Sequence, residues 1–157
     1  MLISVVIPTY NPDFKIFETL KTVKQSILYF QNQTEITYEI LIINDGGKKI
    51  DKQIIELIEN LRVVDLKKNK GVGYAREVGA RISKYEKIFF LDSDVMIDEN
   101  TFHKLYNDFL ELSDAGSLGA LQSYKNLNRS YSSQFVCAKS CYGFENEPEI
   151  IEFSAIH

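Results

Sequence analysis

The sequence is poor in the residues on which several classes of protein depend. It has two cysteines, three prolines, eight glycines and no tryptophan among 157 residues. Cys137 and Cys141 are too few for a disulfide framework, and the two histidines, His103 and His157, form no zinc-ligand pattern with them. So little glycine and proline excludes a collagen-like or low-complexity chain.

Charge of one sign and long apolar runs are also lacking. The 18 basic and 22 acidic side chains leave a net charge of −4, which argues against nucleic acid as a partner, because phosphate binding needs a basic surface. No run approaches the roughly 20 apolar residues that span a bilayer, and Met1 is followed by no basic region of a signal peptide. We therefore expect a cytoplasmic protein, at most peripherally attached to the inner face of the membrane.

What is present is an alternation of short apolar runs with segments of helical spacing. Runs rich in β-branched and aromatic residues predict strands at 2–7, 38–43, 61–66 and 87–91. Apolar residues at steps of three and four predict helices at about 14–30, 54–61, 73–84 and 99–113. Further strands are predicted at 117–123 and 133–138, with a loop between them. The alternation predicts an α/β fold, a mostly parallel sheet with helices on both faces, in one domain over 1–157.

Polar or glycine-rich residues follow each of the first four predicted strands. Ligands of open parallel sheets bind beyond the carboxyl ends of the strands, so these residues are predicted to meet at one edge. One polar strand end would mean little, because turns favour the same residues, but four in register indicate a site. They are Pro8, Thr9, Tyr10, Asn11 and Pro12; Asn44, Asp45, Gly46 and Gly47; Asn69, Lys70, Gly71, Val72 and Gly73; and Asp92, Ser93 and Asp94.

The Asp92-Ser93-Asp94 segment carries the sharpest chemical signal. Two carboxylates that leave a buried strand can face one cleft if the chain turns there, and paired hard oxygens suit Mg²⁺ or Mn²⁺ that also binds substrate phosphates. The competing interpretation is a plain turn that caps the following helix. An EF-hand loop is excluded, because it would need an oxygen ligand at Met96 and a glycine at Ile97. A phosphatase-type aspartate nucleophile, Asp92, stays open.

The other strand ends allow both a binding and a structural interpretation. Segment 71–76 is no dinucleotide fingerprint, because Arg76 stands at the third glycine position, yet Arg76 could reach a phosphate or base. Residues 9–11 could bind a nucleotide through a hydroxyl, an aromatic face and an amide, or simply end a strand. Asp45 could accept a hydrogen bond from a base or stabilise the following turn.

Together these segments resemble the nucleotide-binding half of family 2 glycosyltransferases, which have the Rossmann-like GT-A fold. The matching stretches are SVVIPTYN (4–11), EILIINDGG (39–47), NKGVGYAREVGAR (69–81) and IFFLDSDVMI (88–97), whose Asp-Ser-Asp resembles that family's DXD motif. The resemblance implies transfer, with inversion, of a sugar from a nucleoside-diphosphate sugar, here expected to be a UDP-sugar. The implied acceptor is a hydroxyl of a carbohydrate or lipid-linked molecule, and the implied cofactor is Mn²⁺ or Mg²⁺.

The resemblance also implies roles for single residues. It places Asp45 against the base, Arg76 and Ser93 near the nucleotide, Asp92 at the ribose or metal, and Asp94 on the cation. The residues implied to line the nucleoside pocket are Pro8, Thr9, Tyr10 and Asn11.

Two departures from the family pattern matter. Gly47 stands where relatives often have serine, which removes a hydroxyl. The chain is also short compared with members of the family, which usually carry roughly 70 to 100 further residues. Residues 1–97 would then be the nucleotide-binding half and 98–157 the start of an incomplete acceptor half, truncated at the C-terminus. No catalytic base can be named, so a nucleotide-sugar-binding module without turnover stays open, and the oligomeric state is not predicted.

Overall fold

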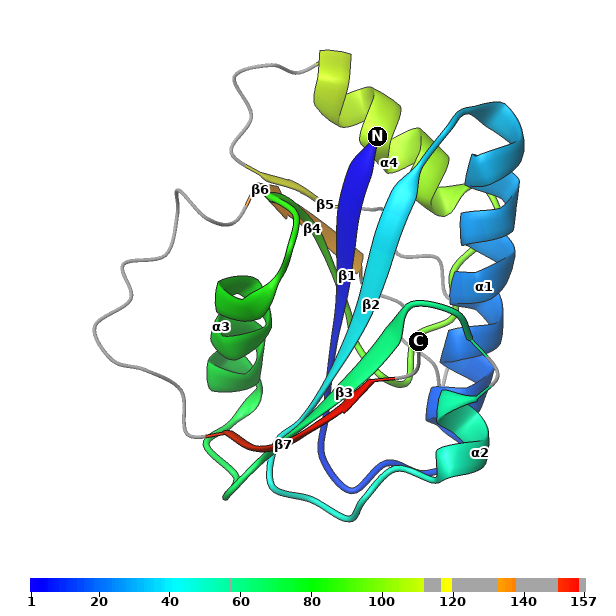
Figure 1. Cartoon of the computed structure of the whole chain (residues 1–157). Helices are drawn as coiled ribbons and strands as arrows, with labels where there is room; N and C mark the ends of the chain where they lie inside the picture. Colours follow the sequence, from blue (N-terminus) through cyan, green and yellow to red (C-terminus); the bar gives the residue numbers. More distant parts are fainter. Residues whose placement is uncertain (57, 112–116, 120–132, 138–149, 156–157) are drawn as a thin grey trace, which may run out of the picture.

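The structure, a computed structural model, describes residues 1–56, 58–111, 117–119, 133–137 and 150–155. Within these ranges seven strands form one sheet in the order β5-β6-β4-β1-β2-β3-β7, and helices lie against both of its faces (Figure 1). The predicted α/β class is therefore confirmed.

Four parallel strands form the centre of the sheet, at the positions predicted from the apolar runs. They are β1 (Leu2–Thr9), β2 (Thr37–Asn44), β3 (Leu61–Leu66) and β4 (Lys87–Leu91). From Ile3 to Thr9 every residue of β1 is buried, as expected of a parallel strand that helices cover on both faces. The β1–β2 pairing ends with Thr9 beside Asn44, so the polar ends of these strands lie side by side.

The helices divide the core into two layers. Helices α1 (Lys15–Gln33), α2 (Lys52–Ile55) and α4 (Thr101–Glu111) cover one face, and α3 (Val72–Ile82) covers the other (Figure 1). Side chains of β1 alternate between the layers, with Val5 on the α1 side and Val6 on the α3 side. Helix α3 lies so close to β1 that a Cβ atom on Gly79 would meet Val6.

Antiparallel strands complete both margins. Strand β6 (Ser133–Cys137) pairs with β4 and with β5 (Ser117–Gly119), the described part of the strand predicted at 117–123, and β7 (Ile150–Ala155) pairs with β3. The sequence did not predict β7, because its pairing with a strand about 90 residues away leaves no local signal. The loop predicted at 124–132 lies outside the described residues.

The strand order creates a crevice at the carboxyl ends. The chain runs outward from β1 through β2 to β3, then crosses back so that β4 pairs on the other side of β1. Connections diverge at such a switch point, which is where open α/β sheets bind ligands. The crevice therefore lies between the ends of β1 and β4, where Thr9 and Asp92 stand.

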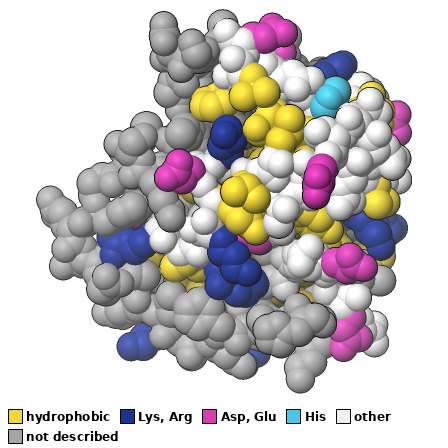
Figure 2. Space-filling view, turned by 45° about the horizontal axis from the view of Figure 1, so that its top comes forward, with side chains coloured by type: hydrophobic (Ala, Val, Ile, Leu, Met, Phe, Trp, Pro, Cys, Tyr) yellow, Lys and Arg dark blue, Asp and Glu magenta, His cyan; other side chains and the backbone are white. Residues whose placement is uncertain are grey.

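The surface shows no dominant charge on the side that Figure 2 presents. This view brings the amino-terminal end of the strands forward, and acidic and basic side chains are interspersed there with small hydrophobic groups (Figure 2). Among the described helices, none combines the length and apolar composition that crossing a membrane requires.

Candidate donor-binding site

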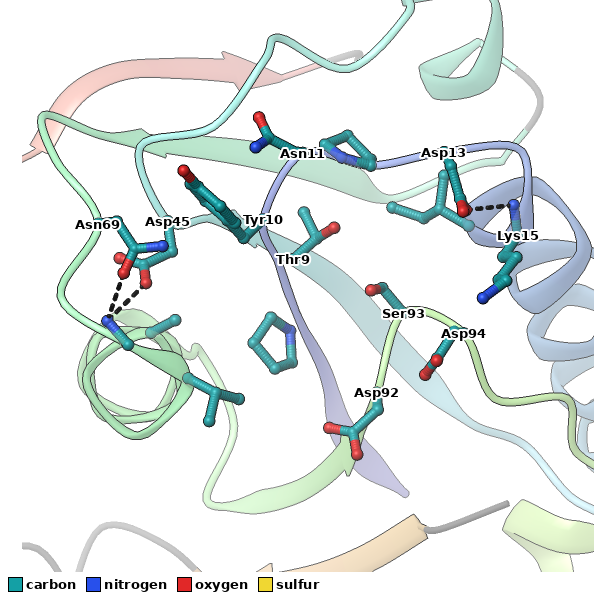
Figure 3. Close-up of a pocket in the computed structure, with 16 residues that line it drawn as sticks. Thr9, Tyr10, Asn11, Asp13, Lys15, Asp45, Asn69, Asp92, Ser93 and Asp94 are labelled. Carbon is teal, nitrogen blue, oxygen red and sulfur yellow. Dashed lines mark hydrogen bonds between the residues drawn. The ribbon is translucent and has the colours of Figure 1, made fainter. Parts of the chain in front are cut away.

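A cavity of about 350 Å³ opens at the carboxyl end of the sheet, within the size range of small-molecule sites. The ends of β1, β2 and β4 and the loop after β3 all contribute to its lining (Figure 3). Twelve of the strand-end residues that the sequence singled out line it: Pro8, Thr9, Tyr10, Asn11, Pro12, Asp45, Asn69, Gly71, Val72, Asp92, Ser93 and Asp94. The structure thus brings them together at one edge of the sheet.

The cavity wall also contains residues that the sequence reasoning missed. Asp13 lines it from just before α1, Lys15 and Ile16 from the first turn of that helix, and Ala75 from α3. The first three lie just past the segment 8–12, so their proximity in sequence was the available signal. That signal was not used, because the path of the chain after β1 could not be read from the sequence.

The end of β1 presents one hydroxyl that lacks a partner. Thr9 is only 5% exposed, and its buried Oγ1 has no hydrogen-bond partner among the described residues. Tyr10, by contrast, is 54% exposed at the rim of the cavity. Burying a hydroxyl without a hydrogen bond costs free energy, so Thr9 is ready to bond a polar ligand atom.

The chain turns after β1 through a left-handed residue. Asn11 has φ 49°, a conformation that asparagine tolerates, and its Oδ1 accepts a hydrogen bond from the Lys48 backbone N–H at 3.0 Å. The backbone of Gly47 comes so close that a Cβ there would meet the backbone nitrogen of Asn11. A serine at position 47 would therefore require the backbone to shift, which explains the glycine at this departure from the family pattern.

Asp45 holds the neighbouring loop in place. Its side chain is buried, and its two oxygens accept hydrogen bonds from the backbone N–H groups of Lys70 at 2.9 Å and Gly71 at 2.7 Å. The sequence offered base contact or support of the following turn as its roles, and the structure adds a third, support of the loop after β3. The base contact stays a prediction. It is compatible with the two backbone hydrogen bonds, because a carboxylate has further lone pairs with which to accept hydrogen bonds.

Asp92 and Arg76 form an ion pair at the edge of the cavity. The Arg76 guanidinium donates to Asp92 Oδ1 at 2.5 Å, and about a third of each side chain is exposed. Arg76 is not among the residues that line the cavity, so it reaches the site through Asp92. The pair offsets the negative charge of Asp92 and fixes the direction of its carboxylate.

Asp94 is the acidic group most open to a ligand. It is exposed, it lines the cavity, and no hydrogen bond or ion pair engages its side chain among the described residues. The Asp92–Val95 segment forms a turn, closed by the Val95 N–H donating to the Asp92 carbonyl at 3.2 Å. The turn lets both carboxylates border one cavity, as the sequence predicted.

These two carboxylates fit a hard divalent cation that arrives with phosphate. No group of three or more His, Cys, Asp or Glu side chains in the described part of the chain could hold a metal alone. Mg²⁺ in particular is commonly bound by one or two carboxylates, with water and substrate phosphates completing its shell. Two carboxylates are therefore the protein ligands that such a cation uses together with a diphosphate.

Comparison with known proteins establishes the family. A family model described as Glycosyl transferase family 2 matches residues 4–150. The chain belongs to this family. One relative, the poly(ribitol-phosphate) beta-N-acetylglucosaminyltransferase TarP of Staphylococcus aureus, is 35% identical over 111 residues, which is 67% of this chain and 32% of TarP. Chondroitin synthase of Escherichia coli is 29% identical over 155 residues, covering 95% of this chain and 21% of that enzyme.

Solved structures of glycosyltransferases share the fold of this family 2 chain. TarS 1-349 of S. aureus, in complex with UDP-GlcNAc, superposes with a TM-score of 0.60 at 26% identity, over 74% of this chain and 33% of TarS 1-349. The GT-A fold expected from the resemblance is thereby confirmed. The chain spans between 21% and 33% of the length of these three relatives.

Proposed function

We propose that this chain binds the donor in a glycosyltransferase that moves a sugar from a UDP-sugar to an acceptor hydroxyl, with inversion at the anomeric carbon. Residues 1–97 would form the donor-binding half. The observation that carries the proposal is the cavity itself, which gathers polar groups from four chain segments at one edge of the sheet. Membership of family 2 favours sugar transfer over a phosphohydrolase that uses Asp92 as nucleophile.

The nucleoside would occupy the part of the cavity between Tyr10 and Asp45. Thr9 supplies a buried hydroxyl without a partner, Tyr10 an exposed aromatic face, and Asp45 a carboxylate fixed by two backbone N–H groups. These are the few fixed polar groups with which a cavity orients a ligand. UDP is the proposed nucleotide because TarS, 26% identical to this chain, is described in complexes with UDP-GlcNAc and with UDP.

The diphosphate would lie beside Asp92 and Asp94. Mn²⁺ or Mg²⁺, held by Asp94 with Asp92 nearby, would supply positive charge to the diphosphate as it leaves. Asp92 is already paired with Arg76, so of these two carboxylates Asp94 is the one with no ion pair among the described residues. The acceptor would be a carbohydrate or lipid-linked hydroxyl, in keeping with the polymer-building names of TarP and chondroitin synthase.

Calorimetric titration of UDP into the chain, with and without Mn²⁺, tests the donor site. We expect UDP to bind more tightly with Mn²⁺, and Asp94→Ala to remove most of that gain while leaving metal-free binding nearly unchanged. The exposed position of Asp94 predicts a change in folding stability within about 0.5 kcal/mol. Absence of UDP binding in both conditions would refute the donor site, and equal losses in both would refute the metal-ligand role.

Turnover separates the enzyme from a module that only binds the donor. UDP release from UDP-GlcNAc should be measured for the chain, with and without carbohydrate acceptors. Acceptor-dependent release supports the transferase. Tight binding of UDP without release from UDP-GlcNAc would favour the module.

A further inference from the structure

One face of α1 presents three hydroxyl side chains to the segment that follows β4. They stand at steps of three and four, which places them on one side of the helix: Thr19, Thr22 and Ser26. The facing segment, 92–100, has neither helix nor strand, so its backbone groups need partners from elsewhere. Thr19 and Thr22 each bond one of these groups, and Ser26 bonds the Phe102 N–H at the start of α4, across 74 to 76 residues of sequence.

The first of these hydroxyls reaches the candidate site. Thr19 is fully buried, and its Oγ1 donates to the carbonyl oxygen of Ser93 at 3.0 Å. That carbonyl belongs to the central peptide of the turn from Asp92 to Val95. Thr19 therefore holds the peptide that joins Ser93 to Asp94, between the two carboxylates that border the cavity.

The central peptide is the part of a β-turn that can flip. Type I and type II turns differ in the orientation of this peptide, and type II needs a positive φ at the third residue, here Asp94. Among the described non-glycine residues, positive φ is found at Asn11 and Asn60. Asp94 has no positive φ, so the turn is not of type II. In the form that it has, the Ser93 carbonyl points at α1. A flip would break the bond from Thr19 and change the direction in which the Asp94 side chain leaves the backbone.

The other two hydroxyls provide matched controls. The Ile97 N–H donates to Thr22 Oγ1, and the Phe102 N–H, in the first turn of α4, donates to Ser26 Oγ, both at 3.2 Å. Each joins α1 to the same stretch of chain by one hydrogen bond, but at increasing distance along the chain from Asp94. Ser26 is buried like Thr19. Removing its hydroxyl therefore perturbs the contact between α1 and the chain after β4, but at a point farther from the cavity.

We propose that Thr19 is a positioning residue of the donor site. Its hydrogen bond to the Ser93 carbonyl, here called the lock, keeps the Asp92–Val95 turn in one form and so holds Asp94 at the cavity. The effect on ligand binding rests on the proposed function, but the lock is a property of the free protein. Thr19→Val keeps the branched shape of the side chain and replaces the hydroxyl with a methyl group. Thr19→Ser retains the hydroxyl and should restore the lock.

Amide hydrogen exchange, measured by NMR on the free protein, tests the lock directly. We expect Thr19→Val to speed exchange of the Val95 amide about fivefold to tenfold, the effect of losing one supporting hydrogen bond. Thr19→Ser should stay near the wild type at Val95. Ser26→Ala should change exchange at Phe102 and leave Val95 unaffected. Unchanged exchange at Val95 in Thr19→Val, or equal changes there in both hydroxyl-deletion variants, would overturn the lock.

Titrations of UDP with and without Mn²⁺ test its consequence at the site. Thr19→Val should weaken Mn²⁺-dependent UDP binding about fivefold to tenfold, with metal-free binding and the Ser26→Ala variant within about twofold of the wild type. Equal losses in Thr19→Val and Ser26→Ala would mean a general loss of stability and would overturn the positioning role. If the wild type binds no UDP with Mn²⁺, the proposed function fails, while the exchange pattern still decides the lock.

Discussion

Strand β2 has a buried carboxylate near each end, and the two ends differ in what surrounds that group. Glu39, near the start, accepts hydrogen bonds from Ser4 Oγ at 2.7 Å and from the Lys84 backbone N–H at 2.5 Å, and it faces Arg62 at 3.6 Å. Asp45, just past the other end, likewise holds the backbone of a neighbouring loop. Both residues are at most 4% exposed.

Only the second end borders the cavity at the carboxyl edge of the sheet. Around Asp45 that cavity also contains Thr9, with a buried hydroxyl that has no described partner, and Asp94, whose carboxylate is open to a ligand. Around Glu39, by contrast, the Ser4 hydroxyl, the Lys84 backbone N–H and the Arg62 guanidinium all face the carboxylate. A buried acid therefore does not by itself identify a site. What identifies the site is a cavity whose lining includes polar groups without hydrogen-bond partners.

Removing Glu39 should produce the largest change in stability. Glu39→Ala deprives Ser4, the Lys84 N–H and Arg62 of a buried acceptor, which should cost about 3 kcal/mol in the free energy of unfolding. Urea unfolding measures this loss, with Glu39→Gln as the milder control because it keeps an acceptor oxygen. The UDP affinity of the folded protein should stay within about twofold. A loss of UDP affinity larger than that would break the distinction between the two ends.

Changing Asp45 should affect both stability and binding. In Asp45→Asn the amide nitrogen cannot accept from one of the two backbone N–H groups, so we expect about 1 to 2 kcal/mol of destabilisation. The loop at 69–71 lines the cavity, so UDP affinity should also fall, by about tenfold. Unfolding and calorimetry on the same samples measure both effects. Destabilisation without loss of affinity would place Asp45 in the same structural class as Glu39.

Thr9→Val should change the free energy of unfolding least of the three variants. Stability should not fall, whereas the affinity for UDP should. The change removes a buried hydroxyl that has no described partner, so stability should stay the same or rise by up to about 1 kcal/mol. UDP affinity should fall about fivefold if the ligand bonds this hydroxyl. Thermal unfolding in the absence and presence of UDP measures both. A clear loss of stability in the free protein would show that the hydroxyl already has a partner.

The sequence predicted the central sheet and the edge at which the site lies. The strands at 61–66 and 87–91 have the predicted bounds, because their β-branched and aromatic runs end at polar or glycine-rich residues. Parallel pairing then brings the carboxyl ends together without further information. The cavity lining at 8–11 and 92–94 followed from that rule alone.

What the sequence could not predict depends on contacts between distant segments. The Arg76–Asp92 pair joins α3 to the end of β4, and the bond from Thr19 to Ser93 joins residues 74 positions apart. Neither leaves a periodic pattern, because each requires the packed positions of two elements. Strand β7 was missed for the same reason.

Paramagnetic broadening of amide NMR signals by a small amount of Mn²⁺, with UDP present, tests the donor site most directly. Because broadening by Mn²⁺ falls steeply with distance, it locates the cation on the protein. We predict loss of the amide signals of Asp92, Ser93 and Asp94 first, with Ser4 and Lys84 beside Glu39 unaffected, and recovery of all three in Asp94→Ala. Broadening that spares 92–94, or that is equally strong at both ends of β2, would contradict a cation-dependent nucleotide site at the carboxyl edge.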